Sequence, residues 1–193
     1  MSAEQYLVPR LPFAEREALR KLLFECIDAL DELGFEFVES AHDESDTTRR
    51  TRFSDEPETS HIELWEDYLG RVRYLRLESS DAAELGRLVE VFERLIPAES
   101  HEALCASAAD SSDPSILYRL GYSAPNEPAK NTVRGVLRGL ESDSLEVAVA
   151  AAEVAGIIGW ADFIEPLRAL RTNTEPGRLR RAAGSSLDLI LGR

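Results

Sequence analysis

Cysteine is scarce in this sequence: Cys26 and Cys105 are the only two among 193 residues. A small secreted chain held together by disulfides needs more cysteines than this. Both lie in stretches with apolar residues at helical spacing, which favours buried free thiols. Cysteine, histidine, aspartate and glutamate also never fall into the spacing of a zinc site. We therefore expect no disulfide framework, no bound metal and no cofactor.

Long apolar runs are absent as well. The sequence has no stretch of about 18 apolar residues, the length that a membrane-spanning helix requires. Its first residues, Met1 to Gln5, lack the basic segment and the apolar core of a secretory signal. These two absences predict a cytoplasmic protein that does not bind membranes.

Catalytic motifs are missing too. The sequence has no Gly-x-Ser-x-Gly, no phosphate-cradling glycine loop and no His-Glu-x-x-His. One of its three histidines, His42, precedes Asp43, Glu44 and Asp46, and together they could bind a divalent cation. Adjacent residues on a loop rarely converge on one ion, so a solvated acidic loop is favoured. The sequence predicts a protein without catalytic residues.

Positive charge is outweighed, since the formal net charge is −14. Residues 1–98 carry 23 acidic and 12 basic side chains, and the remaining 95 residues carry 13 and 10. This charge repels the phosphate backbone, so we expect no nucleic-acid binding. The same field would attract a partner protein with a basic surface and speed its encounter. Acidity that serves only solubility is the alternative.

What the sequence does contain is a change of pattern near Pro97. Before it, residues 13–33 have apolar positions three and four apart, which predicts an amphipathic helix that ends at Gly34. Asp81 is placed to cap a second helix that runs to Leu95. Alternating or β-prone residues predict strands at 35–40, 47–53, 61–65 and 71–78. Residues 1–97 are thus predicted to form a small antiparallel sheet with helices on one face.

After Pro97 the strand pattern disappears and predicted helices come in pairs. Apolar sets recur 30 or 32 residues later: Val133, Leu137 and Leu140 as Phe163, Leu167 and Leu170, and Val147, Ala150 and Ala151 as Leu179, Ala182 and Ala183. Such self-similarity is typical of stacked helical repeats. The helix over 145–158 is apolar almost all round, which predicts burial on several sides. The fold class expected is mostly α: a small α+β domain over 1–97, then a short α-solenoid over 98–193.

The paired helices resemble HEAT repeats of the short bacterial type. The second helix of that family reads roughly Val-Arg-x-Ala-Ala-x-x-Leu-Gly, and residues 143–156 and 175–183 follow this pattern. Pro166 stands at the proline position of the first helix. Ala148 departs from the usual arginine, which Arg180 retains.

This resemblance implies an extended surface that binds other proteins. It places the better repeats at 129–159 and 161–192 and a degenerate one at 98–124, with Asp113-Pro114 as its turn. A departure lies at Asn173 and Thr174, where the family has a turn aspartate. Some HEAT-like proteins are phycobilin lyases or DNA glycosylases, so fold alone does not decide the function.

Candidate partner-binding residues are charged side chains in three places. They are Asp43, Glu44 and Asp46 in an acidic loop, Glu63, Glu66 and Asp67 at a hairpin edge, and Arg178 and Arg181 on the last helix. For the hairpin acids, exposed charge is favoured over a carboxylate pair for acid–base work. The basic strip Arg49 to Arg52 is expected to form internal salt bridges.

The sequence therefore predicts a non-catalytic protein–protein interaction module, with an immunity-type inhibitor of a basic partner as its most specific form. Size, acidity and the lack of catalytic motifs support this, and no motif names the partner. The alternative is a HEAT-like enzyme or enzyme accessory, similar to a phycobilin lyase or a DNA glycosylase.

Overall fold

A computed structural model describes residues 3–11, 13–56, 58–108, 111–173 and 177–192 of the chain. Contacts divide the chain into two compact units, unit 1 (Met1–Glu99) and unit 2 (Ser100–Arg193). The sequence pattern places the boundary after residue 97. Thr174, Glu175 and Pro176, which belong to the second repeat pattern, lie outside the described residues.

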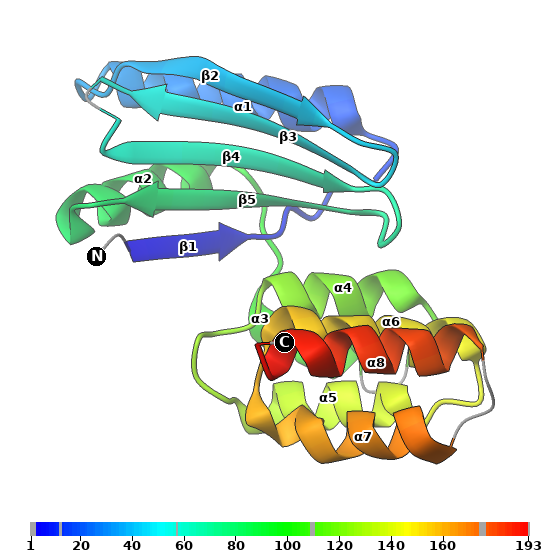
Figure 1. Ribbon diagram of the computed structural model, residues 1–193. Coiled ribbons are helices and arrows are strands. Elements are labelled where there is room, and N and C mark those ends of the chain that lie inside the picture. Colours follow the sequence, from blue (N-terminus) through cyan, green and yellow to red (C-terminus); the bar gives the residue numbers. More distant parts are fainter. Residues whose placement is uncertain (1–2, 12, 57, 109–110, 174–176, 193) are drawn as a thin grey trace. The chain divides into compact units, whose positions relative to one another are not determined.

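Unit 1 is built on a five-stranded antiparallel sheet (Figure 1). Its strands are β1 (Ala3–Leu7), β2 (Phe37–Glu44), β3 (Thr48–Asp55), β4 (Ser60–Asp67) and β5 (Val72–Ser79). The order across the sheet is β1-β5-β4-β3-β2, because the first strand pairs with the last. Strands β1 and β2 are therefore the two edges.

The expectation of a mostly helical chain with a small sheet is wrong. The described residues form eight α-helices and the five-stranded sheet, 54% helix and 21% strand, which is a mixed α+β fold. The sheet is larger than predicted because β1 was missed and β2 to β5 each run for eight residues. Helices are also interleaved with strands in unit 1. Stretches such as 42–44 and 49–52 are polar on both faces, so no alternation reveals them.

Two helices, α1 (Arg16–Asp31) and α2 (Ala82–Leu95), cover one face of this sheet. Asp81 caps α2 as predicted, since its carboxylate accepts hydrogen bonds from the backbone N–H groups of Ala83 and Glu84 at 2.7 and 3.1 Å. Gly34 follows α1 with φ +86°, the left-handed conformation that ends many helices. The predicted start of α2 is confirmed, whereas α1 ends at Asp31, two residues before the predicted end, and Gly34 lies in the turn that follows.

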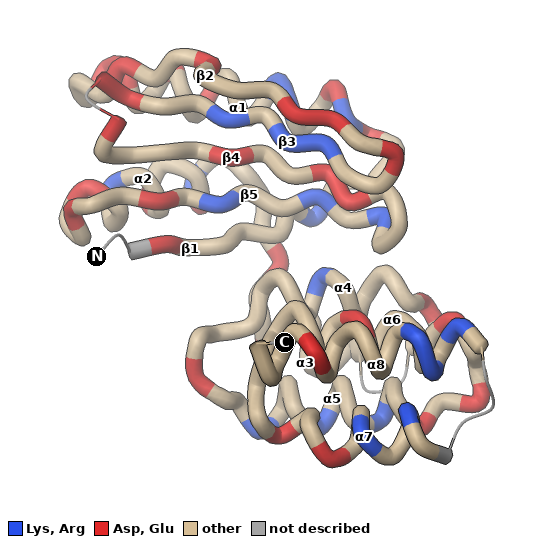
Figure 2. Tube along the Cα trace, in the orientation of Figure 1, with Lys and Arg blue, Asp and Glu red and all other residues tan. Residues whose placement is uncertain are grey.

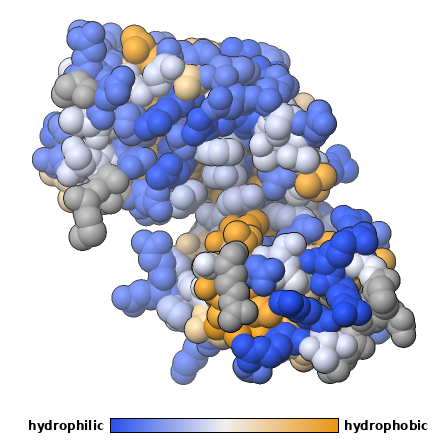
Figure 3. Space-filling model, viewed as in Figure 1, coloured by the Kyte–Doolittle hydropathy of each residue, from blue (hydrophilic) through white to orange (hydrophobic). Residues whose placement is uncertain are grey.

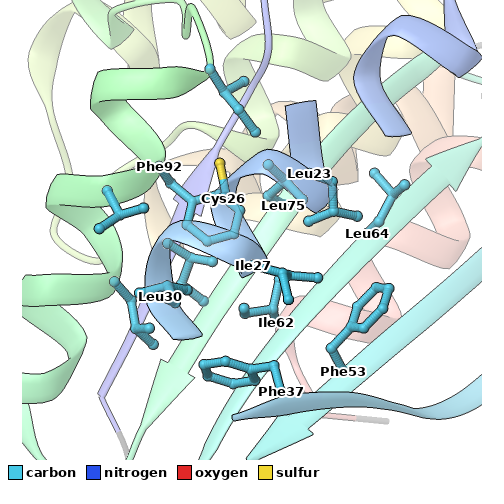
Figure 4. Close-up of a cluster of buried hydrophobic side chains, with 14 of the residues drawn as sticks. Leu23, Cys26, Ile27, Leu30, Phe37, Phe53, Ile62, Leu64, Leu75 and Phe92 are labelled. Atoms are coloured by element: carbon cyan, nitrogen blue, oxygen red, sulfur yellow. The ribbon is translucent and has the colours of Figure 1, made fainter. Parts of the chain in front are cut away.

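The core of unit 1 lies between the helices and the sheet (Figure 4). From α1 it takes Leu23, Cys26, Ile27 and Leu30, which recur at helical spacing. Phe92 of α2 packs on the same cluster. The strands contribute alternate residues, including Phe53, Ile62, Leu64 and Leu75. Because strand neighbours point to opposite faces, the residues between these core positions lie on the other face of the sheet.

Unit 2 is helical throughout its described residues. Its elements are α3 (His101–Ala108), α4 (Pro114–Tyr122), α5 (Lys130–Leu140), α6 (Leu145–Ile158), the 3-10 helix η1 (Ala161–Phe163), α7 (Ile164–Asn173) and α8 (Arg178–Ile190). Successive helices pack in pairs, and α6 also contacts α4 and α8. Burial of α6 on several sides is confirmed, since its residues from Val147 to Ala152 are all buried. None of the helices in the described residues has the length and apolar character that a membrane span needs.

Candidate protein-binding surface

Glu63 of β4 lies on the sheet face that carries no helix of unit 1, yet it is only 2% exposed. Three arginine side chains surround its carboxylate: Arg76 at 3.3 Å, Arg50 at 3.6 Å and Arg52 at 3.7 Å. The indole Nε1 of Trp65 donates a hydrogen bond to the same carboxylate at 2.9 Å. The face of unit 1 drawn in Figure 3 is mostly hydrophilic, consistent with such a cover of charged side chains.

Glu66 is equally buried, at 2% exposure, but on the helix-facing side. Arg73 Nε donates to its carboxylate at 2.7 Å and Arg16 Nε at 3.0 Å, while Arg49 lies 3.8 Å away. A buried carboxylate with such partners holds the fold together, since removing one member leaves an uncompensated charge. The prediction of an exposed hairpin edge is therefore wrong for Glu63 and Glu66.

Asp67 has a local role in the same hairpin. Its carboxylate accepts hydrogen bonds from the backbone N–H groups of Leu69 and Gly70, each at 2.9 Å. The left-handed position of this turn is Arg71, with φ +50°, and not the glycine. Asp67 thus closes the β4–β5 turn.

The predicted acidic loop is partly strand. Asp43 and Glu44 are the last residues of β2, and Asp46 lies in the turn to β3; all three are exposed. Asp43 pairs with Arg50, and Glu44 lies 4.0 Å from Arg49.

The predicted internal salt bridges of the basic strip are confirmed. Arg49 lies near Glu44 and Glu66, and Arg50 and Arg52 lie near Glu63.

The possible cation site at His42 is not formed. His42 and Asp43 are strand neighbours and point to opposite faces, so they cannot share one cation. Among the described residues, no three metal-ligating side chains converge.

Arg178 and Arg181 are exposed on the first turn of α8, as the sequence predicts. Neither makes an ion pair within the described part of the chain. A helix N-terminus is the positive end of the helix dipole, so the dipole does not stabilise these two cations.

A polar cluster in unit 2 brings together a histidine, a cysteine and two hydroxyl groups. His101 Nε2 lies 2.7 Å from Thr132 Oγ1 and 3.4 Å from Cys105 Sγ, and His101 Nδ1 lies 3.0 Å from Ser123 Oγ. Burial lowers the pKa of His101 and raises the pKa of the Cys105 thiol. Both groups are therefore neutral near pH 7, opposite to the thiolate and imidazolium of an activated pair. The cluster joins α3 to α5.

Unit 1 has a group of exposed acidic residues in the segment where α1 ends and β2 begins. We name this set the acidic corner: Asp28, Asp31, Glu32, Glu36 and Glu39. Within the described residues, none of the five carboxylates makes a hydrogen bond or an ion pair. Figure 2 marks acidic positions along β2 and its flanks. The corner is therefore a concentration of negative charge without a described ion pair, and only Glu39 among the five lines a pocket with arginines, Arg16, Arg20 and Arg49.

Three of these acids oppose the helix that carries them. Asp28 and Asp31 are in the last turn of α1, Glu32 is its C-cap, and the last turn has no basic residue. The C-terminus of a helix is the negative end of its dipole, where a carboxylate costs about 0.3–1 kcal/mol at low ionic strength. Natural sequences break such local rules mainly at functional sites.

Apolar side chains are exposed in the same segment. Leu33 is 55% exposed and Val38 is 61% exposed. Strand β2 is also an edge, paired only with β3, and its register shifts at a bulge between Glu39 and Ala41. Acids and a bulge protect an edge strand from nonspecific pairing. Charge, apolar contact area and a free strand edge are together in residues 28–44.

The acidic corner was not among the predicted partner-binding residues. The sequence does contain a signal for it, because the helix predicted to end at Gly34 has acids and no base in its last turn. Burial of Glu63 and Glu66, in contrast, depends on arginines from other strands, which no local pattern gives.

No family model matches the chain, and neither a curated protein nor a solved structure matches it. The resemblance to HEAT repeats therefore stays a prediction.

Proposed function

We propose that this protein is a non-catalytic binding module that engages a basic partner protein through the acidic corner. The observation that carries the proposal is the placement of Asp28, Asp31 and Glu32 at the negative end of the α1 dipole with no base in the last turn of the helix. Their carboxylates cost folding stability and accept no described hydrogen bond, so a binding role accounts for their presence.

The corner has the composition that a protein interface needs. Its unpaired carboxylates would steer a positively charged surface and set its orientation. Leu33 and Val38 would then supply apolar contact area, which charge alone does not provide. Asp46 adds an exposed acid after the end of β2, whereas Asp43 and Glu44 are paired with Arg50 and Arg49.

The setting that we propose is immunity-type inhibition in the cytoplasm. A toxin that acts on nucleic acid presents a basic surface to the phosphate backbone. A small acidic protein could cover that surface and exclude the substrate. The net charge of −14 supports this choice of partner over an acidic one.

The test begins with capture of a partner from the native organism on the immobilised protein, followed by affinity measurement with the purified partner. The decisive variant is Asp28→Asn with Asp31→Asn and Glu32→Gln. We expect its affinity to fall by about tenfold or more, as loss of several interface charges does. Its free energy of unfolding should rise, by about 0.3–1 kcal/mol per site, because the dipole conflict is removed.

The matched control neutralises three exposed acids in loops, by Glu56→Gln, Glu127→Gln and Asp143→Asn. It removes the same charge and should keep affinity within about threefold, since distant surface charges are largely screened. Equal loss of affinity in both triple variants would mean that net charge alone matters. An unchanged affinity in the first variant would place the interface elsewhere and overturn the proposal.

A further inference from the structure

A groove of about 330 Å³ runs along the outer side of α5 in unit 2. Val133 and Leu137, one helical turn apart, form its apolar floor and are half-buried. Lys130, Arg134 and Arg138 line it on the same helix. Its remaining lining comes from Pro128, Glu141 and Asp162. The groove is thus apolar at its base and mainly basic at its rim.

Two of the three cations of this groove are available. Lys130 and Arg134 are exposed, and within the described residues neither makes an ion pair or a hydrogen bond. Glu141 and Asp162 are the acids of the lining, and they leave both cations unpaired.

We infer that the groove binds an acidic amphipathic helix of another protein. Lys130, Arg134 and Arg138 recur every fourth residue, about 6 Å apart along the axis. Carboxylates four residues apart on a second helix have the same repeat, so a helix lying along α5 can place one opposite Lys130 and another opposite Arg134. Its leucine-like side chains at i and i+4 would pack on the row formed by Val133 and Leu137.

A nucleic acid fits the groove less well. Phosphates would meet the three cations, but the apolar floor offers them no partner, and the chain as a whole repels the backbone. A peptide helix uses the floor and the rim together. This surface lies in unit 2 and is independent of the acidic corner, so the two proposals can fail separately.

The experiment measures fluorescence anisotropy of a labelled synthetic peptide added to the full chain. The peptide has leucines at i, i+3, i+4 and i+7 and glutamates at the flanking positions. The control peptide has glutamine in place of each glutamate. We expect saturable binding of the acidic peptide and an affinity lower by about tenfold or more for the glutamine peptide. Arg134→Glu and Lys130→Glu should each lower the affinity for the acidic peptide by about tenfold or more.

Arg180→Glu is the matched control, because it reverses an exposed arginine of the same unit on α8. It should change the affinity by less than about twofold, as distant charges are screened. An equal effect of Arg180→Glu would move the site to α8 and overturn the inference. The inference would also fail if the acidic peptide did not bind, if the glutamine peptide bound equally tightly, or if a single-stranded oligonucleotide bound more tightly than the acidic peptide.

Discussion

At the scale of single residues, carboxylates of unit 1 divide into two groups with opposite roles. Glu63 and Glu66 are buried among arginines and hold strands β3, β4 and β5 together. Those of the acidic corner are exposed and have no described partner. Both groups contribute to the same net charge, so composition alone could not separate them. What separates them is whether an arginine on a neighbouring strand or helix reaches the carboxylate.

Removing the charge of Glu66 tests the structural role. Glu66→Gln keeps the size of the side chain but leaves Arg73, itself buried, without its counter-ion. We expect a loss of about 3 kcal/mol in the free energy of unfolding, measured by urea denaturation. Glu56→Gln, at an exposed position, should change it by less than about 0.5 kcal/mol. A similar small effect at Glu66 would mean that this ion pair adds little to the fold.

The half-buried histidine of unit 2, His101, predicts a pH dependence of stability. Burial lowers the pKa of His101 in the folded protein, so the unfolded chain takes up the proton more readily. The stability that neutral His101 provides is complete above the unfolded pKa, about 6.5, and is lost as pH falls towards the folded pKa. Urea denaturation between about pH 7.5 and 5 should show a steeper decline for the wild type than for His101→Gln. Parallel declines would show that His101 is not the group responsible.

At the scale of elements, unit 2 depends on close helix contacts. A methyl group added at Gly156 of α6 would lie 2.9 Å from Ser186 Cα, a backbone atom of α8 that cannot rotate away. At Gly184 of α8 the nearest atom would be Cδ of Arg171, at 4.0 Å, which is an ordinary van der Waals contact. The first glycine is required by packing and the second is not.

Paired substitutions test this contact. Gly156→Ala should destabilise the protein by about 1–3 kcal/mol because the helices must separate. Gly184→Ala should stabilise it by up to about 1 kcal/mol, since alanine is the better helix former. Thermal unfolding followed by circular dichroism measures both. If the two variants shifted Tm in the same direction, α6 and α8 would not pack as closely as described.

How much of the fold the sequence could predict also depended on the element. Helix α2 was predictable because Asp81 and the apolar spacing are both local features. Strand β1 was not, because it is five residues long and is stabilised by pairing with β5, more than 60 residues away in the chain. The α5 groove could not be predicted from the sequence for a similar reason. Val133 and Leu137 have the spacing of core residues, and only the neighbours of α5 decide that one side stays open.

At the scale of the whole molecule, charge is uneven. Residues 1–98 hold 23 of the 36 acidic side chains and 12 of the 22 basic ones. Unit 1 therefore produces most of the negative field, with the acidic corner as a part of it that has no described ion pair. Unit 2 has little net charge and carries its cations along an apolar groove. The two surfaces would favour partners of opposite charge.

The most direct test of the acidic corner is the association rate constant with the captured partner across a salt series. Raising ionic strength from about 0.01 to 0.15 M shortens the Debye length from about 30 to 8 Å. The wild-type association rate should fall by about tenfold or more over this range, with little change in dissociation. The variant with Asp28→Asn, Asp31→Asn and Glu32→Gln should associate more slowly at low salt and respond less to added salt. An association rate insensitive to salt, or the same salt dependence in wild type and variant, would contradict the assignment of partner binding to this corner.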